Sequence, residues 1–472
     1  MHLILRIAAC ISAVSLTAGC NSSDAKAREA LGDYQTAAAA NDMVGAHRAL
    51  LELVRAKDDV PDYWVELGKV QASMGSYSDA YYAFTRAYEL NRSDPTILRT
   101  VTELALRAGD ISLAESHAQE LEMVSPGDPW VKLTEGWSAF SQGQFDKAMA
   151  AADSLLANSP YDPSATVLKS RALIAMDREN EAETILLSQT QSQPSDSGSM
   201  QALARIYQQR GDWAKVAQIA GRIATLNPGD QSNRFLLAQA AFRSGNVAVA
   251  RQASFDLLRP DADPPLLASV LDMWSEYWPS PQRIEDARRL ASAAPALEQR
   301  LLYATFLSRW GSPSDAIRLS SAAATLPVDA RSAEANAVLA DAFSRSGNLG
   351  AAKSRFDAVL AFDPGNATAL RGRSELELKT GHAAAAIVDA QKLVSVLPNS
   401  ATDRLLLARS YSAAGNARWA DRTLWTAFQQ IPADEKILAA LEASKRGDAE
   451  GIRDLQEEFV RQRSGKLNRG LM

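Results

Sequence analysis

Few side chains in this sequence have the types and spacing that catalysis or metal binding needs. Both cysteines, Cys10 and Cys20, lie in the first twenty residues, where neither can cross-link a fold that begins later. The four histidines are scattered, and no HExxH, CxxC or paired-histidine spacing occurs, so no metal site is predicted. GxGxxG, Walker-type and GxSxG motifs are also missing from the sequence. We therefore expect a protein without enzyme activity, cofactor, metal or small-molecule substrate.

Cys20 is the cysteine whose position indicates a function, because it ends an N-terminal segment with the layout of a secretory signal. His2 and Arg6 form a weakly basic start, and residues 7–17 are uncharged, mostly apolar and too short to span a bilayer. Residues 16–20 are LTAGC, ending at Cys20, and they resemble the lipobox of bacterial lipoproteins. The resemblance implies that residues 1–19 are removed and that Cys20 carries fatty acyl chains. An ordinary signal peptide with a chance cysteine, or a buried N-terminal helix, is the alternative.

Residues 20–26 would then be a short tether that keeps the folded body near the membrane. In enterobacterial lipoproteins an aspartate after the cysteine favours the inner membrane, and here the residue is Asn21. We expect a periplasm-facing, lipid-anchored envelope protein, in the outer membrane rather than the inner one. The membrane itself would be contacted through the acyl chains on Cys20.

The overall composition is that of a globular protein with a mixed, mildly acidic surface. The chain has 472 residues, of which 46% are hydrophobic and 22% charged, and its formal net charge is −6. No block of five or more like charges occurs. A nucleic-acid partner is not expected, because such proteins carry a basic stripe.

Three residue types recur with a common period of about 34 positions through most of the chain. Glycines occur in one phase at Gly75, Gly109, Gly143, Gly211, Gly245, Gly347, Gly381 and Gly415. Prolines recur in a second phase at Pro126, Pro160, Pro194, Pro228, Pro364, Pro398 and Pro432. Alanines follow the glycine phase by five positions, at Ala46, Ala80, Ala114, Ala148, Ala182, Ala250, Ala352, Ala386 and Ala420. The pattern predicts a glycine that ends one helix, an alanine where two helices approach closely, and a proline that ends the second helix.

This pattern resembles the tetratricopeptide repeat (TPR), a helix-turn-helix unit of the same length. The best copy spans residues 61–94, where Trp64, Leu67, Gly68, Gly75, Ala80, Phe84 and Ala87 match the marked positions in order. Residues 27–434 amount to twelve units of this length. The resemblance implies an all-α fold, a right-handed superhelical solenoid of about twelve repeats with capping helices at its C-terminal end. A generic alanine-rich bundle is the alternative, but it gives no reason for three phases in register.

The array is divided by a less regular middle part. We expect an N-terminal TPR array at 27–264, degenerate TPR-like repeats at 265–332 and a C-terminal array at 333–434. Six of the 19 prolines lie between Pro260 and Pro295, so a hinge near 260–282 is one interpretation and irregular packing the other. Residues 435–472 are expected to hold capping helices, over 435–446 and from 449 to about 463, and a tail.

The TPR resemblance also implies which side chains face a partner, since positions 2, 5, 9, 12 and 13 of each first helix line the concave surface of such arrays. They include Trp130, Leu133, Trp137, Phe140, Arg171, Ile174, Arg205, Phe235, Phe242 and Arg243. Aromatic and arginine side chains dominate binding hot spots, so a groove for an amphipathic helix or extended peptide is predicted. The alternative is that these residues pack on neighbouring helices. The cluster Trp274, Tyr277 and Trp278 is interpreted as core, with sugar stacking as the alternative.

The overall plan resembles periplasmic TPR lipoproteins that support exopolysaccharide export. This resemblance implies a membrane-anchored scaffold whose partners are outer-membrane or periplasmic subunits of such a complex, or of another secretion complex. An adaptor for murein hydrolases and a pilus-assembly factor are alternatives of the same class. A glycan-binding protein or an enzyme is the alternative from another class.

Overall fold

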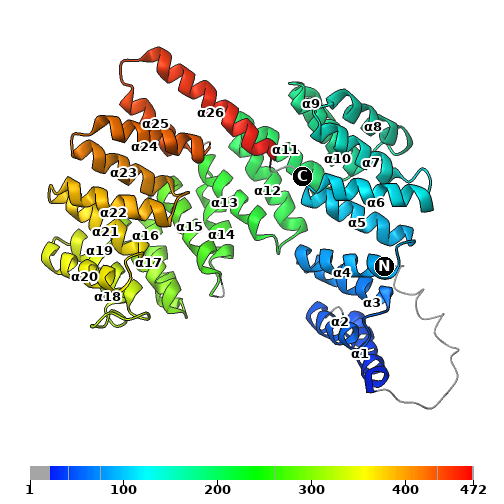
Figure 1. Cartoon of the computed structure of the whole chain (residues 1–472), viewed down its shortest axis with the longest axis horizontal. Coiled ribbons are helices and arrows are strands. Elements are labelled where there is room, and N and C mark those ends of the chain that lie inside the picture. Colours follow the sequence, from blue (N-terminus) through cyan, green and yellow to red (C-terminus); the bar gives the residue numbers. More distant parts are fainter. Residues whose placement is uncertain (1–21, 41, 75, 261, 433, 470–472) are drawn as a thin grey trace. The chain divides into compact units, whose positions relative to one another are not determined.

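The computed structural model describes residues 22–40, 42–74, 76–260, 262–432 and 434–469, and within these ranges it contains 26 α-helices and no strand (Figure 1). The predicted signal, Cys20 and Gly75 lie outside these ranges. None of the described helices combines the length and the apolar character needed to cross a bilayer. The chain divides into two compact units between Ser192 and Gln193, and each is described by itself.

Unit 1 is a stack of antiparallel helical hairpins in which each odd-numbered helix pairs with the next helix. Its helices are α1 (Ser22–Ala39), α2 (Met43–Ala56), α3 (Pro61–Ser73), α4 (Tyr77–Leu90), α5 (Pro95–Ala108), α6 (Ile111–Val124), α7 (Pro129–Ser141), α8 (Phe145–Asn158), α9 (Pro163–Ala175) and α10 (Glu179–Ser192).

Unit 2 continues the same pattern and ends in two further helices. Its first part contains α11 (Ser197–Arg210), α12 (Trp213–Leu226), α13 (Gln231–Arg243), α14 (Val247–Leu257), α15 (Pro264–Tyr277), α16 (Gln282–Ala293), α17 (Leu297–Trp310) and α18 (Pro313–Ser320). Its second part contains α19 (Ala333–Arg345), α20 (Leu349–Phe362), α21 (Ala367–Lys379), α22 (Ala383–Val396), α23 (Ala401–Ala413), α24 (Ala417–Gln430), α25 (Glu435–Ser444) and α26 (Ala449–Arg469). The prediction of an all-α helical repeat fold is confirmed.

A recurring aspartate starts the first helix of the regular hairpins. Asp94, Asp128, Asp162, Asp196 and Asp230 follow the period of the repeat, and each side chain accepts a hydrogen bond from a backbone N–H of the helix that follows. After the first three a proline occupies the first helical position, where no intrahelical N–H bond is lost. These caps fix where each hairpin begins, and Asp434 does the same for α25.

The alanine phase marks the closest approach of helices, as predicted. Eight of its nine members are at most 2% exposed, and Ala420 is 5% exposed. A comparable approach occurs at Gly68 in α3, where an added Cβ would lie 2.7 Å from the Phe84 ring of α4. Small residues at these positions let the two helices of a hairpin pack directly against each other.

The glycine phase provides the left-handed turn after the first helix. Gly109 (φ 78°) and Gly211 (φ 73°) directly follow α5 and α11, and their N–H groups bond to carbonyls of the last helical turn. In the hairpin α9–α10 the same phase is held by Asp177, which adopts a φ of 59°. The turn geometry is therefore kept even where the glycine is absent.

The predicted degenerate stretch does contain two hairpins, α15–α16 and α17–α18. Their first helices begin at Pro264 and Leu297, close to the expected starts at 265 and 299. The difference is in α18, which has only eight residues and is followed by a non-helical segment up to Ala333. The boundary between the compact units lies elsewhere, so a hinge near 260–282 stays a prediction.

The end of unit 2 meets its beginning through α25 and α26. Arg243 at the end of α13 pairs with Glu435 at 2.7 Å (Nη2–Oε1), and Lys436 pairs with Glu276 of α15 at 2.9 Å (Nζ–Oε2). The last helix, α26, contacts α11 and extends to Arg469, beyond the end expected near residue 463. Unit 2 is thus closed by contacts between helices that are distant in the sequence.

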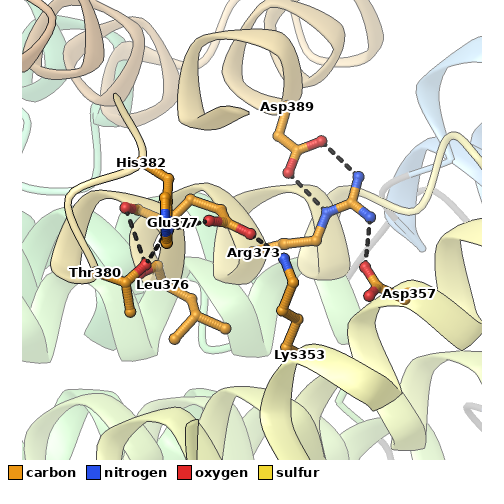
Figure 2. Close-up of polar contacts among 8 residues, drawn as sticks. All are labelled: Lys353, Asp357, Arg373, Leu376, Glu377, Thr380, His382 and Asp389. Atoms are coloured by element: carbon orange, nitrogen blue, oxygen red, sulfur yellow. Dashed lines mark hydrogen bonds and ion pairs between the residues drawn. The ribbon is translucent and has the colours of Figure 1, made fainter. Parts of the chain in front are cut away.

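Figure 2 shows the polar contacts that hold α21 between its neighbours. Arg373 makes a bidentate ion pair with Asp389 of α22, at 2.8 and 2.7 Å, and a further bond of 2.8 Å to Asp357 of α20. One turn later, Glu377 accepts from Lys353 of α20 and contacts His382. These contacts involve Arg373 and Glu377, which lie on one face of α21. The opposite face of the helix takes no part in them.

Candidate functional site

The predicted concave-face residues of unit 1 form one cluster on α7 and α9. The rings of Trp137 and Phe140 lie 5.7 Å apart at an interplanar angle of 76°. The guanidinium carbon of Arg171 lies 5.0 Å from the centroid of the Trp137 ring and 5.7 Å from that of Phe140. This is a cation–π arrangement that joins two successive hairpins.

The cluster is partly core and partly accessible. Leu133 and Arg171 are 4% and 2% exposed, so a partner would touch little of either side chain. Trp130, Trp137, Phe140 and Ile174 are half-buried, and Trp130 packs against two hydrophobic clusters of the unit. These four side chains are the part of the predicted surface that is left available, and their role in binding a partner stays a prediction.

The other predicted residues lie in unit 2 and are used mainly for packing. Arg205 is half-buried, and this burial lowers the pKa of its guanidinium. Phe235 packs against the core cluster that includes the buried Phe242, whose ring is 5.7 Å from that of Trp278. Arg243 lies over Trp213, at 4.0 Å, and forms the ion pair with Glu435.

The aromatic cluster of the irregular middle is core, in agreement with the sequence-based interpretation. Trp274 is fully buried and Trp278 is 3% exposed, with their ring centroids 5.2 Å apart. Trp274 also contacts the rings of Phe255 and Phe306 edge-on. Sugar stacking on these two tryptophans is therefore sterically blocked.

A cavity of about 790 Å³ opens on the inner face of unit 2. It is enclosed by the first helices α15, α17, α21, α23 and α25, together with α24. The side chains at its charged and aromatic positions are Asp272, Arg309, Trp310, Arg371, Glu375, Arg409, Asp421 and Lys436. Ser275, Thr402, Ser412 and Ser444 add hydroxyl groups to the lining.

Three of these charges are neutralised by partners in the wall. Arg371 makes a bidentate pair with the buried Asp403, at 2.6 and 2.8 Å. Glu375 accepts from Arg345 at 2.8 Å, and Lys436 pairs with Glu276. Arg371 and Glu375 lie one turn apart on α21. Each precedes Arg373 or Glu377 by two residues, which puts the two pairs on roughly opposite sides of the helix.

Four other charges of the lining have no hydrogen bond or ion pair to the residues described: Arg309, Arg409, Asp272 and Asp421. The Nε of Arg309 is buried without an acceptor.

The cavity walls also affect how its acids ionise. Asp272 is exposed to the cavity, but the surrounding protein displaces bulk water and raises the pKa of its carboxyl, against the lowering effect of Lys436, Arg309 and Arg371. Burial likewise raises the pKa of Glu276, but hydrogen bonds from Tyr277 and Lys436 outweigh it, and the net pKa is lowered. The two neighbouring carboxyls of α15 therefore differ in proton affinity.

The lining of this cavity is not among the residues predicted from the sequence, although much of it occupies the inward positions of its repeats. In the repeat that starts at 367, Arg371 and Glu375 hold positions 5 and 9. In the repeat that starts at 401, Thr402, Leu405, Arg409 and Ser412 hold positions 2, 5, 9 and 12. The inward positions of the repeat therefore predict the correct helix face. The predicted partner-binding residues came from the aromatic-rich repeats, whereas this lining belongs to repeats with fewer aromatic residues at those positions.

Comparisons with known proteins agree with the repeat assignment. Residues 132–268 match the family described as "Psidin, N-terminal TPR repeats region", and residues 338–395 match the family described as "Tetratricopeptide repeat". The two matches fall in both parts of the array, on either side of the degenerate hairpin α17–α18.

Two curated relatives share a longer stretch of the sequence. "Cellulose synthase operon protein C" of Pseudomonas fluorescens (strain SBW25) is 29% identical over 265 residues, which cover 52% of this chain and 20% of that protein. "Cellulose synthase 2 operon protein C" of Komagataeibacter xylinus is 27% identical over 244 residues, or 48% of this chain and 18% of that protein. The similarity therefore spans about a fifth of the length of these relatives.

Solved structures of helical repeat proteins resemble the chain more distantly. MamA (residues 41 to the end) from Desulfovibrio magneticus RS-1 is 18% identical, with a TM-score of 0.31, over 36% of this chain and 97% of MamA. The APC/C hetero-tetramer Cut9–Hcn1 is 15% identical, with a TM-score of 0.31, over 95% of this chain and 96% of the matched chain. At these scores the superpositions carry no argument about function.

The hairpin geometry and the family matches together define the class of this protein. It is a TPR scaffold for protein–protein interaction, built of helical hairpins that present side chains of their first helices. Half of its length is also similar in sequence to part of two cellulose synthase operon C proteins.

Proposed function

We propose that this chain is a non-enzymatic, membrane-anchored scaffold of the bacterial envelope that supports an exopolysaccharide export complex. The observation that carries the proposal is the similarity of half of the chain to two cellulose synthase operon C proteins, in a chain whose fold offers docking surfaces. Its partners are outer-membrane or periplasmic subunits of that complex. The half-buried aromatic residues of α7 are the proposed contact point in unit 1.

The anchoring part of the proposal is supported by the lipobox-like sequence that ends at Cys20. Acyl chains on this cysteine hold the protein stably at a membrane only if two or more are present, as the lipoprotein resemblance implies. Outer-membrane placement is supported by the absence of aspartate at position 21.

Anchoring is tested with the substitution Cys20→Ser in the full chain, expressed in a bacterial host with its own export machinery. We expect the native chain in the outer-membrane fraction and the variant in the soluble fraction, with mass spectrometry of the native N-terminus showing acylation. The matched control is Cys10→Ser, which leaves Cys20 in place and should not change the fractionation. A native chain with an unmodified thiol would rule the anchor out.

Partner binding is tested by crosslinking and gentle detergent extraction of the native chain, followed by the double substitution Trp137→Ala with Phe140→Ala. We expect an envelope protein to co-purify and its recovery to fall about tenfold in the variant, since removing two hot-spot aromatics costs at least that much. Tyr82→Ala is the control, because this aromatic of α4 is 61% exposed and lies outside the predicted surface.

The thermal melt of the double variant separates binding from packing. Helix content and melting temperature close to those of the native chain, with partner recovery lost, support an interface. A strong fall in melting temperature means that both rings are core, and undiminished recovery means that the partner binds elsewhere. The scaffold proposal itself is rejected if no envelope protein co-purifies with the native chain.

A further inference from the structure

The cavity of unit 2 has the size of a ligand site. Its volume of about 790 Å³ lies within the range of roughly 300–1,000 Å³ that is typical of small-molecule pockets. Six helices from α15 to α25 line it, and one lining residue, Lys436, is held by its ion pair with Glu276. The concavity is thus formed by contacts that unit 2 makes within itself.

The free charges of the lining are balanced. Arg309 and Arg409 supply donors without acceptors among the described residues, while Asp272 and Asp421 supply acceptors without donors. Two positive and two negative groups cancel, so these four charges favour neither an acidic nor a basic ligand. A hydroxyl group both donates and accepts, so a neutral ligand rich in hydroxyls can satisfy both kinds of group at once.

An aromatic face stands beside these charges. Trp310 follows Arg309 at the end of α17, lines the cavity and is 49% exposed. The guanidinium carbon of Arg283 lies 5.1 Å from the centroid of its ring. An exposed indole in a concave, polar surface is a platform for the apolar C–H face of a sugar ring, since it combines a flat hydrophobic area with a polar edge.

The apolar part of the wall is poorly suited to a peptide anchor. Leu406 and Leu424, which lie behind the charged residues, are 3% and 7% exposed, and the remaining small wall residues are mainly alanines. The lining thus offers few large apolar side chains to hold the anchor residues of a peptide.

We propose that the unit 2 cavity binds a neutral saccharide chain, stacked on Trp310 and hydrogen-bonded to Arg309, Arg409, Asp272 and Asp421. β-1,4-linked glucose fits this chemistry well, because its equatorial hydroxyls leave both ring faces apolar. The inference goes beyond the scaffold function and concerns a different surface from the aromatic residues of α7. Neither Trp274 nor Trp278 takes part, since both are buried.

The probe is cellohexaose, titrated into the detergent-solubilised full chain by isothermal calorimetry. We expect saturable binding that is at least tenfold weaker in Trp310→Ala and in the double variant Arg409→Gln with Asp421→Asn. Trp419→Ala is the matched control: Trp419 is also 49% exposed, but it does not line the cavity, so its loss should leave binding unchanged.

Three outcomes would overturn the proposal. The first is no saturable heat with cellohexaose at millimolar concentrations. The second is binding that Trp419→Ala weakens as much as Trp310→Ala does. The third is a preference for hexaglutamate or an oligomannuronate over the neutral sugar, which would make the site one for acidic peptides or acidic glycans. Circular dichroism melts of every variant establish that the fold is intact. If no envelope protein co-purifies with the native chain while the sugar still binds, only the scaffold proposal is rejected.

Discussion

At the scale of single residues, Asp177 shows how strictly the hairpin turn is maintained. It lies one repeat after Gly143 and one repeat before Gly211, in the turn between α9 and α10, and it has a φ of 59°. Aspartate tolerates this left-handed region better than most residues, but less well than glycine. The turn geometry is therefore imposed by packing of the two helices, and the residue adapts to it.

This strain leads to a paired prediction. Asp177→Gly should raise the free energy of unfolding by up to about 1 kcal/mol, because relief of left-handed strain outweighs the greater chain entropy of glycine. The reciprocal change, Gly143→Asp (φ 74° in the native chain), should lower it by a similar amount. Chemical denaturation followed by circular dichroism measures both. A stabilisation by both changes, or by neither, would mean that φ does not decide the energetics of this turn.

At the scale of secondary-structure elements, the distance between the helices of a hairpin depends on a few small residues. Gly68 of α3 faces Phe84 of α4, a ring that is 6% exposed and enclosed by the core of unit 1. A methyl group at Gly68 would approach three carbons of that ring to between 2.7 and 3.0 Å. A buried, rigid ring cannot move aside without displacing its neighbours.

We predict that Gly68→Ala destabilises the protein by about 1–3 kcal/mol through overpacking. The control is Gly221→Ala in the interior of α12, where the nearest atom to an added Cβ is 3.8 Å away; it should stabilise by roughly 0.5–1 kcal/mol because alanine favours the helix. Thermal melts of the full chain show whether each substitution raises or lowers the melting temperature. A stabilising Gly68→Ala would show that the hairpin can open at this point without cost.

The elements that the sequence predicted well are those defined by local chemistry. The hairpins starting at 61, 95, 129 and 163 begin at those residues. Each of their first helices has a proline at its first position, and an aspartate caps the last three, so signals within a few residues set these starts. The helices α15 and α17 start one or two residues before the expected positions, where the glycine phase is lost. Helix α18 has only eight residues, and no residue pattern in the sequence predicts that it is shorter than the other second helices.

The candidate cavity could not be derived in the same way, since it depends on contacts between distant repeats. Asp272 and Lys436 line one cavity, yet several repeats separate α15 from α25 in the sequence. Periodicity specifies which face of α15 or α25 points inward, but not how tightly successive hairpins rotate. Likewise, the buried state of Leu133 and Arg171 follows from the packing of α7 on α9, which spacing alone does not give.

At the scale of the whole molecule, unit 2 departs from the usual behaviour of repeat proteins, in which each repeat contacts only its neighbours. Arg243 and Glu435 form a hydrogen-bonded ion pair across 192 residues of sequence. Lys436 reaches Glu276 in the same region, and α26 contacts α11. These contacts couple the last helices to the first ones, so unit 2 should open less independently at its C-terminal end than a linear array would.

A charge swap tests this coupling. Arg243→Glu and Glu435→Arg should each speed amide hydrogen exchange in α25, because each places like charges where the pair stood. The double variant should exchange more slowly than either single one. The expected coupling is about 0.2–1 kcal/mol, since both side chains are partly exposed. Exchange in the double variant should still be faster than in the native chain. The swap removes the stacking of Arg243 on Trp213 and the acidic residue in the first turn of α25. If exchange in the double variant is as fast as the two single effects added together predict, the pair contributes nothing and α25 is held by its hairpin neighbours alone.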